Sequence, residues 1–375
     1  MRAVALALAA AAMPAAVLSQ PLSAAALPSD TGAAPGLGQL AYIAASGELD
    51  LTTISGDGSM TTPQKIGPAT AVPAGSTVTI YGPTASAGGA WLAWSEEVKN
   101  GDHYSSRIVL RRTSDGQIEK LNASKNDAAP VGFVGQHLVV GTFGKLWVVQ
   151  AGATQSLKPL ASSRKDSTFF GTDQAGVVYE RGFAVPGAPE RIELMGLNGR
   201  STVLHTFPGS MFKGSHAPLE QGWVDPDGRD VVFEQGDHTD FGGVGPISQA
   251  FAISGLHPSR AVQLGHPGKP LPIQRMGSTS FAADTPYSVW ALTDERVPTG
   301  SVYSDDGDGW RLVASDSLVA AGNLAGDVIT QPAKFVDAGV DAPAYNIEPT
   351  GNAELHVGGD TFPVALQSSA MVWLD

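Results

Sequence analysis

The chain of 375 residues contains no cysteine, so disulfides, thiolate metal sites and cysteine nucleophiles are absent from its chemistry. Charged residues are also scarce, at 16%, and 23 basic residues stand against 36 acidic ones, for a formal charge of −13. This negative charge repels phosphate groups and offers no gain from counterion release. We therefore expect no nucleic-acid partner and no binding to anionic lipid surfaces.

Long apolar runs are confined to the amino terminus. Met1 and Arg2 precede an Ala-rich apolar run that ends in small residues at Ser23 to Ala26, in the order of a secretory signal peptide. We predict a signal peptide over residues 1–26, a disordered leader rich in Gly, Pro and Ala over 27–38, and one folded region over 39–375. The protein is then secreted, extracellular or held in the cell envelope. An uncleaved membrane anchor is the alternative, and no later stretch reaches the roughly 18 apolar residues of a spanning helix.

Turn-forming residues are abundant. The chain has 45 Gly and 26 Pro, and 42% of its residues are hydrophobic, which is enough to build a core. This composition predicts many turns between short strands and argues against long helical bundles.

A short apolar strand returns at a period of roughly 47 residues, which is the length of a propeller blade. These predicted second strands of each unit are LAYIA, WLAWSE, LVVGT, VVYER, VVFEQ, VWALT and VITQ, starting at Leu40, Trp91, Leu138, Val177, Val231, Val289 and Val328. A strand of alternating polar and apolar residues follows each of them, the last being AYNIEP. The sequence thus predicts an all-β, seven-bladed β-propeller. Six or eight blades, or two β-sandwiches, are the alternatives.

A glycine follows each alternating strand, where a tight hairpin needs a residue that accepts a positive φ. The predicted turn glycines are Gly56, Gly116, Gly152, Gly199, Gly255, Gly309 and Gly351. The final segment AMVWLD, from Ala370, looks like an eighth second strand without a turn after it. We predict that this tail joins the blade begun at Leu40 and closes the ring, because an open ring would leave two exposed sheet edges.

The segment WVDPDGRDVVFEQ contains Asp225, Pro226, Asp227 and Gly228 directly before an apolar strand. It resembles the repeat phrase of TolB-type β-propellers, in which Ser is usual at the position of Asp225. TDQAGVVY and NLAGDVIT are weaker relatives of the phrase elsewhere in the chain. The resemblance implies an exported propeller that binds other proteins and takes part in envelope translocation without chemistry of its own. A second segment, YSDDGDGW from Tyr303, resembles the Asp-box turn of sialidase-like propellers, which implies a turn between strands and no activity.

Two loops share the triplet Gly-Asp-His, at residues 101–103 and 236–238, and Asp240 follows the second. Imidazole nitrogen and carboxylate oxygen can together bind a divalent cation or hold a water as a general base. The candidate ligand-binding residues are Asp102, His103, Asp237, His238 and Asp240. The alternative is that they are ordinary polar loop residues, so we assign no metal, no cofactor and no catalytic residue. The remaining six histidines lack a metal-ligand spacing and are predicted to be surface or turn residues.

The sequence contains neither the Gly-x-Ser-x-Gly elbow of hydrolases nor a Gly-rich phosphate loop. We therefore expect a secreted, monomeric and non-catalytic propeller that binds a protein or a cell-envelope polymer. The alternative is a carbohydrate-active or metal-dependent hydrolytic propeller enzyme that uses the two Gly-Asp-His loops.

Overall fold

The structure of the chain is a computed structural model. It describes residues 36–72, 74–122, 128–142, 145–153, 157–160, 167–181, 189, 191–207, 219–224, 230–235, 249–254, 262–263, 275–282, 285–294, 297–305, 310–337 and 345–374. The chain divides into Met1–Ala33 and Ala34–Asp375, and all described residues lie in the second unit. Apart from one 3-10 turn, Ala87–Gly89, their regular structure is entirely β, and none of their helices is long and apolar enough to cross a membrane.

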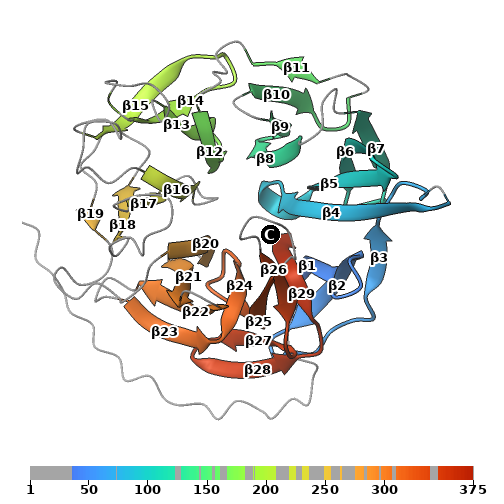
Figure 1. Cartoon of the computed structure of the whole chain (residues 1–375), viewed down its shortest axis with the longest axis vertical. Helices are drawn as coiled ribbons and strands as arrows, with labels where there is room; N and C mark the ends of the chain where they lie inside the picture. The colour runs from blue at the N-terminus through green and yellow to red at the C-terminus, as the bar shows by residue number, and fades with distance from the viewer. Residues whose placement is uncertain are drawn as a thin grey trace, which may run out of the picture. The chain divides into compact units, whose positions relative to one another are not determined.

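The strands described in this unit pair antiparallel into seven sheets (Figure 1). The first sheet joins the two ends of the unit in the order β29 (Ser368–Leu374), β1 (Gly36–Ala44), β2 (Leu49–Ser55) and β3 (Gln64–Gly67). The second consists of β4 (Ser76–Ala85), β5 (Trp91–Asn100), β6 (His103–Arg112) and β7 (Ile118–Asn122). The third consists of β8 (Ala129–Val134), β9 (His137–Thr142), β10 (Lys145–Gln150) and β11 (Lys158–Pro159).

The remaining sheets repeat this order. The fourth consists of β12 (Ser167–Thr172), β13 (Val177–Arg181), β14 (Arg191–Met195) and β15 (Ser201–Thr206). The fifth consists of β16 (Leu219–Val224), β17 (Asp230–Gln235), β18 (Gln249–Ser254) and β19 (Val262–Gln263). The sixth consists of β20 (Arg275–Ala282), β21 (Thr285–Asp294), β22 (Val297–Asp305) and β23 (Trp310–Ser315). The seventh contains β24 (Ser317–Gly322), β25 (Val328–Asp337), β26 (Tyr345–Pro349), β27 (Ala353–Val357) and β28 (Asp360–Val364).

All seven predicted second strands occupy the second position of a sheet, as β1, β5, β9, β13, β17, β21 and β25. Their apolar runs are nearly continuous, as expected for strands of a sheet that is covered on both faces. In β1, Leu40 and Tyr42 pack with residues of the seventh sheet, whereas Ala41 and Ile43 pack with residues of the second. The core of the unit therefore lies between successive sheets, as expected for a propeller.

The first strands lie next to one another around the unit. β29 contacts β4, and contacts continue through β8, β12, β16, β20 and β24, which in turn contacts β29. Figure 1 shows the sheets set around a common axis, with these strands nearest to it. The all-β propeller prediction is thus supported.

The carboxyl-terminal segment differs from its predicted role. It is not an eighth second strand but the first strand of the first sheet, where β29 pairs with β1 from Gln39 opposite Leu374 to Ala44 opposite Ser368. Strand β1 itself begins at Gly36, slightly before the predicted start of the folded region at residue 39.

The predicted third strand of the seventh sheet is only partly correct. AYNIEP forms β26, which pairs with one half of β25, while β27 pairs with the other half. The hairpin turn therefore falls at Gly358 and Gly359, with φ of 57° and 98°, and not at Gly351.

The turn glycines of the first four sheets are largely as predicted. Gly116, Gly152 and Gly199 have φ of 72°, 79° and 77°. In the first sheet the left-handed residue is Gly58 and not Gly56; a Cβ on Gly58 would lie 2.7 Å from the carbonyl oxygen of Pro363 in the seventh sheet. Gly255 and Gly309 lie outside the described residues.

The two weaker relatives of the TolB-like phrase form the same kind of turn between a first and a second strand. The Asp173 carboxylate accepts hydrogen bonds from the backbone N–H of Ala175 (2.9 Å) and Gly176 (2.7 Å). The Asn323 side-chain oxygen accepts them from Ala325 (3.0 Å) and Asp327 (2.8 Å). The phrase itself, with Asp225, Pro226, Asp227 and Gly228, lies between β16 and β17 but outside the described residues.

Candidate functional site

The first Gly-Asp-His triplet forms the tip of the β5–β6 hairpin. Asn100 pairs with His103, and Gly101 makes the turn with a φ of 58°. Asp102 and His103 are both exposed at this tip. Among the described residues, no three His, Cys, Asp or Glu side chains lie close enough together to hold a metal ion.

The second triplet, with Asp237, His238 and Asp240, lies outside the described residues. It falls between β17 and β18, which are the second and third strands of the fifth sheet. The first triplet also connects a second strand to a third strand. Both triplets therefore occupy the same kind of connection, and their meeting across one face stays a prediction.

The hairpin around Asp102 is formed by two long strands of the second sheet. Strands β4, β5 and β6 have ten residues each, whereas most strands of the other sheets have four to seven. The halves of these strands nearest to the tip of the β5–β6 hairpin carry a row of exposed side chains on one face. The register places Thr77, Lys99 and Tyr104 side by side, with Thr79 and then Tyr81 further along β4. We call these five residues the tyrosine face.

The two tyrosines are the most conspicuous members of the tyrosine face. Tyr81 is 48% exposed and Tyr104 is 44% exposed. The Lys99 ammonium lies 5.2 Å from the centre of the Tyr104 ring, and this neighbouring tyrosine raises the pKa of Lys99 above its ordinary value. The face thus combines aromatic rings, threonine hydroxyls, one cation and the partly exposed Glu97 carboxylate, which the register places opposite Thr79. This combination suits a polar ligand with some apolar surface.

The opposite face of the same strands is covered by the connection between the first and second sheets. The Glu96 carboxylate, fully buried, accepts hydrogen bonds from the backbone N–H of Ala69 (2.5 Å) and Thr70 (3.2 Å) and from the Trp94 indole (2.9 Å). The Lys120 ammonium donates to the Ala69 carbonyl at 2.6 Å. A buried carboxylate is tolerable only with such partners, so this network fixes the connection against the sheet.

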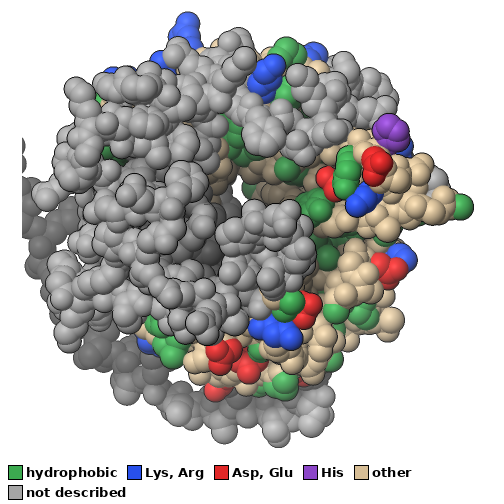
Figure 2. All heavy atoms as spheres, viewed as in Figure 1, with side chains coloured by type: hydrophobic (Ala, Val, Ile, Leu, Met, Phe, Trp, Pro, Cys, Tyr) green, Lys and Arg blue, Asp and Glu red, His purple; other side chains and the backbone are tan. Residues whose placement is uncertain are grey.

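Charges of both signs are scattered over the described part of the face in Figure 2. Lys and Arg side chains lie interspersed with Asp and Glu, without a large patch of either sign. The described part of the molecular surface in Figure 2 therefore gives no indication of a strongly charged ligand.

Sequence reasoning missed the tyrosine face. The sequence signal for this face is the length of the alternating pattern in STVTIY of β4 and HYSSRIV of β6. In both strands the alternation continues for more residues than a short blade strand contains. The pattern gives the alternation but not how far the neighbouring sheet reaches, so it does not tell an exposed tyrosine from a buried one.

No protein-family model matches the chain, and no curated protein matches it. Among solved structures, it is similar to the uncomplexed acylaminoacyl peptidase of Pyrococcus horikoshii, with a TM-score of 0.52 and 11% identity over 88% of this chain and 52% of that one. It is also similar to an oligogalacturonate lyase in complex with manganese, with a TM-score of 0.50 and 15% identity over 90% of this chain and 86% of that one. The chain has a β-propeller fold.

A third similarity, to a prolyl endopeptidase, has a TM-score of 0.50 and 15% identity over 88% of this chain and 49% of that one. The propeller thus spans about half the length of the two peptidase chains and most of the lyase chain. At 11% to 15% identity these similarities show the fold alone. They give no support to the TolB-type resemblance in particular.

Proposed function

We propose that this chain is an exported, closed, seven-bladed propeller that binds a neutral polysaccharide of the cell envelope through the tyrosine face. The observation that carries the proposal is the pair of exposed tyrosines, Tyr81 and Tyr104, on the ten-residue strands β4 and β6. Tyrosine rings stack on the C–H faces of sugars, and the hydroxyls of Thr77 and Thr79 lie in position to bond to sugar hydroxyls. The formal charge of −13 disfavours an anionic polymer.

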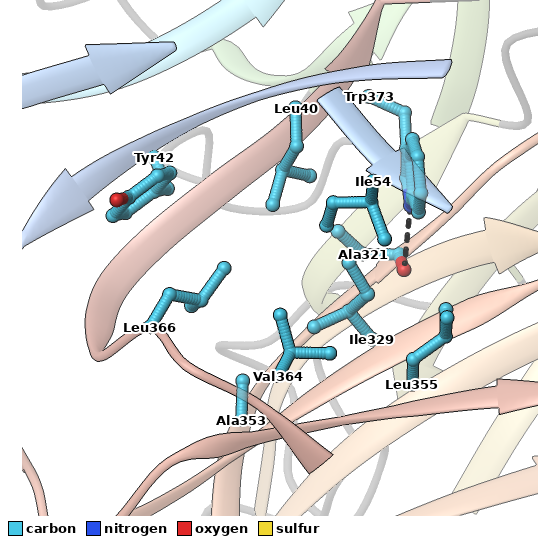
Figure 3. Close-up of a cluster of buried hydrophobic side chains, with 10 residues drawn as sticks. All are labelled: Leu40, Tyr42, Ile54, Ala321, Ile329, Ala353, Leu355, Val364, Leu366 and Trp373. Carbon is cyan, nitrogen blue, oxygen red and sulfur yellow. Dashed lines mark hydrogen bonds between the residues drawn. The ribbon is translucent and has the colours of Figure 1, made fainter. Parts of the chain in front are cut away.

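Ring closure by the carboxyl-terminal strand makes such a face rigid. Strand β29 pairs with β1, and the Trp373 indole donates a hydrogen bond to the Ala321 carbonyl of the seventh sheet at 3.2 Å (Figure 3). The backbone pairing joins the two ends of the unit in the first sheet, and the Trp373 side chain links this sheet to the seventh. A rigid scaffold reduces the entropy lost when a ligand binds.

A metal-dependent, carbohydrate-active enzyme is the second candidate. The similarity to oligogalacturonate lyase in complex with manganese favours it, since it covers 86% of that chain, and all three of the similar proteins described above are enzymes. On this hypothesis Asp102, His103, Asp237, His238 and Asp240 hold the cation. The comparisons support this candidate more than they support a non-catalytic binder.

One experiment separates the two candidates. The mature protein is incubated with insoluble neutral polysaccharides and with purified cell walls, and both retention and released sugar are measured with and without Mn²⁺. For the binder, we expect Tyr81→Ala with Tyr104→Ala to weaken retention about tenfold or more, without sugar release. The matched control is Ile118→Ala with Val203→Ala, which removes two exposed apolar side chains elsewhere.

The outcomes are distinct. Sugar release that is lost with a chelator and with His103→Ala plus His238→Ala would establish the enzyme. Retention that is unchanged by the tyrosine substitutions would contradict the proposed face. Capture of a protein from the cell-wall fraction, with no retention on the polysaccharide, would replace the polysaccharide by a protein partner.

A further inference from the structure

Two arginines lie side by side on the fourth sheet, whereas the tyrosine face belongs to the second. Arg181 of β13 pairs directly with Arg191 of β14, and Arg191 pairs in turn with Thr206 of β15. Residues that pair directly in an antiparallel sheet share a face, with Cβ atoms about 5 Å apart. The two guanidinium groups and the Thr206 hydroxyl therefore project from one face of the sheet.

This face is the one turned toward the third sheet. Tyr179, two residues before Arg181, packs in a cluster with Val139 and Leu146 of the third sheet. Side chains two residues apart in a strand point to the same face, so Arg181 points this way as well. The described third-sheet residues in the cluster are all apolar, so they bring no carboxylate to the arginines.

A buried carboxylate of the fourth sheet itself fixes Arg181. Glu193 is 2% exposed, and it accepts hydrogen bonds from the Tyr179 hydroxyl at 2.5 Å and from Arg181 Nη1 at 3.3 Å. Burial and the bond to Glu193 raise the pKa of Tyr179 to about 12, so its hydroxyl stays protonated and donates to Oε2. The other carboxylate oxygen, Oε1, is left for Arg181, whose guanidinium is thereby oriented.

Arg191 has no such partner among the described residues. The ion pairs within 4.0 Å between those residues do not include it, and its side chain is partly exposed. Like charges directly opposite each other destabilise a sheet, and Glu193 neutralises only one of the two arginines. The described part of this face therefore keeps an excess positive charge, which attracts an anion from solvent.

We propose that Arg181, Arg191 and Thr206 bind a single tetrahedral oxyanion, of which phosphate is the simplest. A guanidinium donates parallel N–H bonds to phosphate or to carboxylate. Two guanidiniums and one hydroxyl can serve three or more acceptor oxygens, whereas a carboxylate offers only two. The formal charge of −13 opposes a polyanion, so the ligand is a phosphate ion or one phosphate monoester.

The test uses isothermal titration calorimetry on the mature protein with inorganic phosphate, methyl phosphate, sulfate and acetate at equal ionic strength. We expect phosphate and sulfate to bind, and acetate to bind about tenfold more weakly or worse than phosphate. Methyl phosphate separates the two sources of the anion. Binding as tight as that of phosphate points to a monoester, and much weaker binding points to the free ion.

Substitutions assign the binding to the arginine pair. Arg191→Gln should weaken phosphate binding about tenfold or more. Its melting temperature in phosphate-free buffer should stay the same or rise, because the change removes a like-charge contact. Arg191→Lys keeps the charge but not the paired donors, so its affinity should lie between those of Arg191→Gln and the original chain. The matched control is Arg200→Gln, which removes the same charge from an exposed residue in the β14–β15 turn and should leave binding intact.

Three results would overturn the proposal. They are no binding of phosphate at millimolar concentration, acetate binding as tight as phosphate binding, and equal phosphate affinities of Arg191→Gln and Arg200→Gln. A large fall in the phosphate-free melting temperature of Arg191→Gln would assign this arginine a structural role instead. None of these results bears on polysaccharide retention by the tyrosine face.

Discussion

Trp373 offers the sharpest test of how the two ends of the unit are joined. Its side chain is 4% exposed and packs in the cluster that contains Leu40, Ile54 and Leu355, drawn from the first and seventh sheets (Figure 3). Its indole also satisfies the Ala321 carbonyl. A single side chain near the end of the chain therefore links both sheets.

The magnitude follows from these contacts. Trp373→Phe keeps most of the apolar surface but leaves the Ala321 carbonyl without its donor, which costs about 1–3 kcal/mol of unfolding free energy. Trp373→Ala also removes the packed ring, which costs about 3–5 kcal/mol. Since whole domains are stable by only about 5–15 kcal/mol, the alanine variant should lose about a fifth or more of the total.

Urea unfolding followed by far-ultraviolet circular dichroism measures both values. The matched control is Ile118→Ala, whose side chain is 42% exposed and whose loss should cost under about 0.5 kcal/mol. If Trp373→Ala costs no more than this control, the carboxyl-terminal strand does not hold the first and seventh sheets together and the reasoning fails.

Three further results are expected. Glu96→Gln should cost about 1–3 kcal/mol in urea unfolding, because an amide replaces a buried carboxylate that three N–H groups bond to; an unchanged midpoint would show that the connection is not held this way. Gly300→Ala should cost about 1–3 kcal/mol, since its Cβ would lie 1.7 Å from Leu318 Cδ2 of the next sheet, and a stability equal to that of the original chain would contradict the close packing of β22 on β24. The lowered pKa of His356 means that the unfolded chain binds its proton more readily, so its contribution is complete above pH 6.5 and is lost as pH falls through the lower folded pKa. His356→Gln should therefore show less loss of stability between about pH 7 and pH 5 than the original chain, and equal losses would refute the assignment.

The second strands are predictable from the sequence because those of the first and second sheets are covered on both faces. LAYI and WLAW are apolar at successive positions, which a strand with one wet face would not be. The turn glycines are predictable where the local backbone conformation alone requires glycine, as at Gly116. They were not readable at Gly56 and Gly58, which both suit a turn, because the approach of Pro363 from a distant sheet decides between them.

The candidate sites depend on such distant contacts even more. Tyr42 and Tyr104 both lie in strands, yet Tyr42 is 4% exposed and Tyr104 is 44% exposed. Their surroundings differ because Tyr42 packs against the seventh sheet, whereas Tyr104 lies beside the tip of the β5–β6 hairpin. Strand periodicity does not distinguish these two positions.

The measurement that most directly tests closure of the ring is a disulfide between β1 and β29. The chain has no cysteine, so two introduced cysteines are its only thiols. Ala41 pairs with Val372 and Tyr42 pairs with Met371, and both the wide and the narrow spacing of opposite residues in antiparallel strands lie within the Cα separations that a disulfide spans. We expect one of the double-cysteine variants to oxidise in the folded protein, while the control Ala93→Cys with Val372→Cys stays reduced. Failure of both β1–β29 pairs to oxidise, in proteins that remain folded, would contradict a propeller closed by its carboxyl-terminal strand.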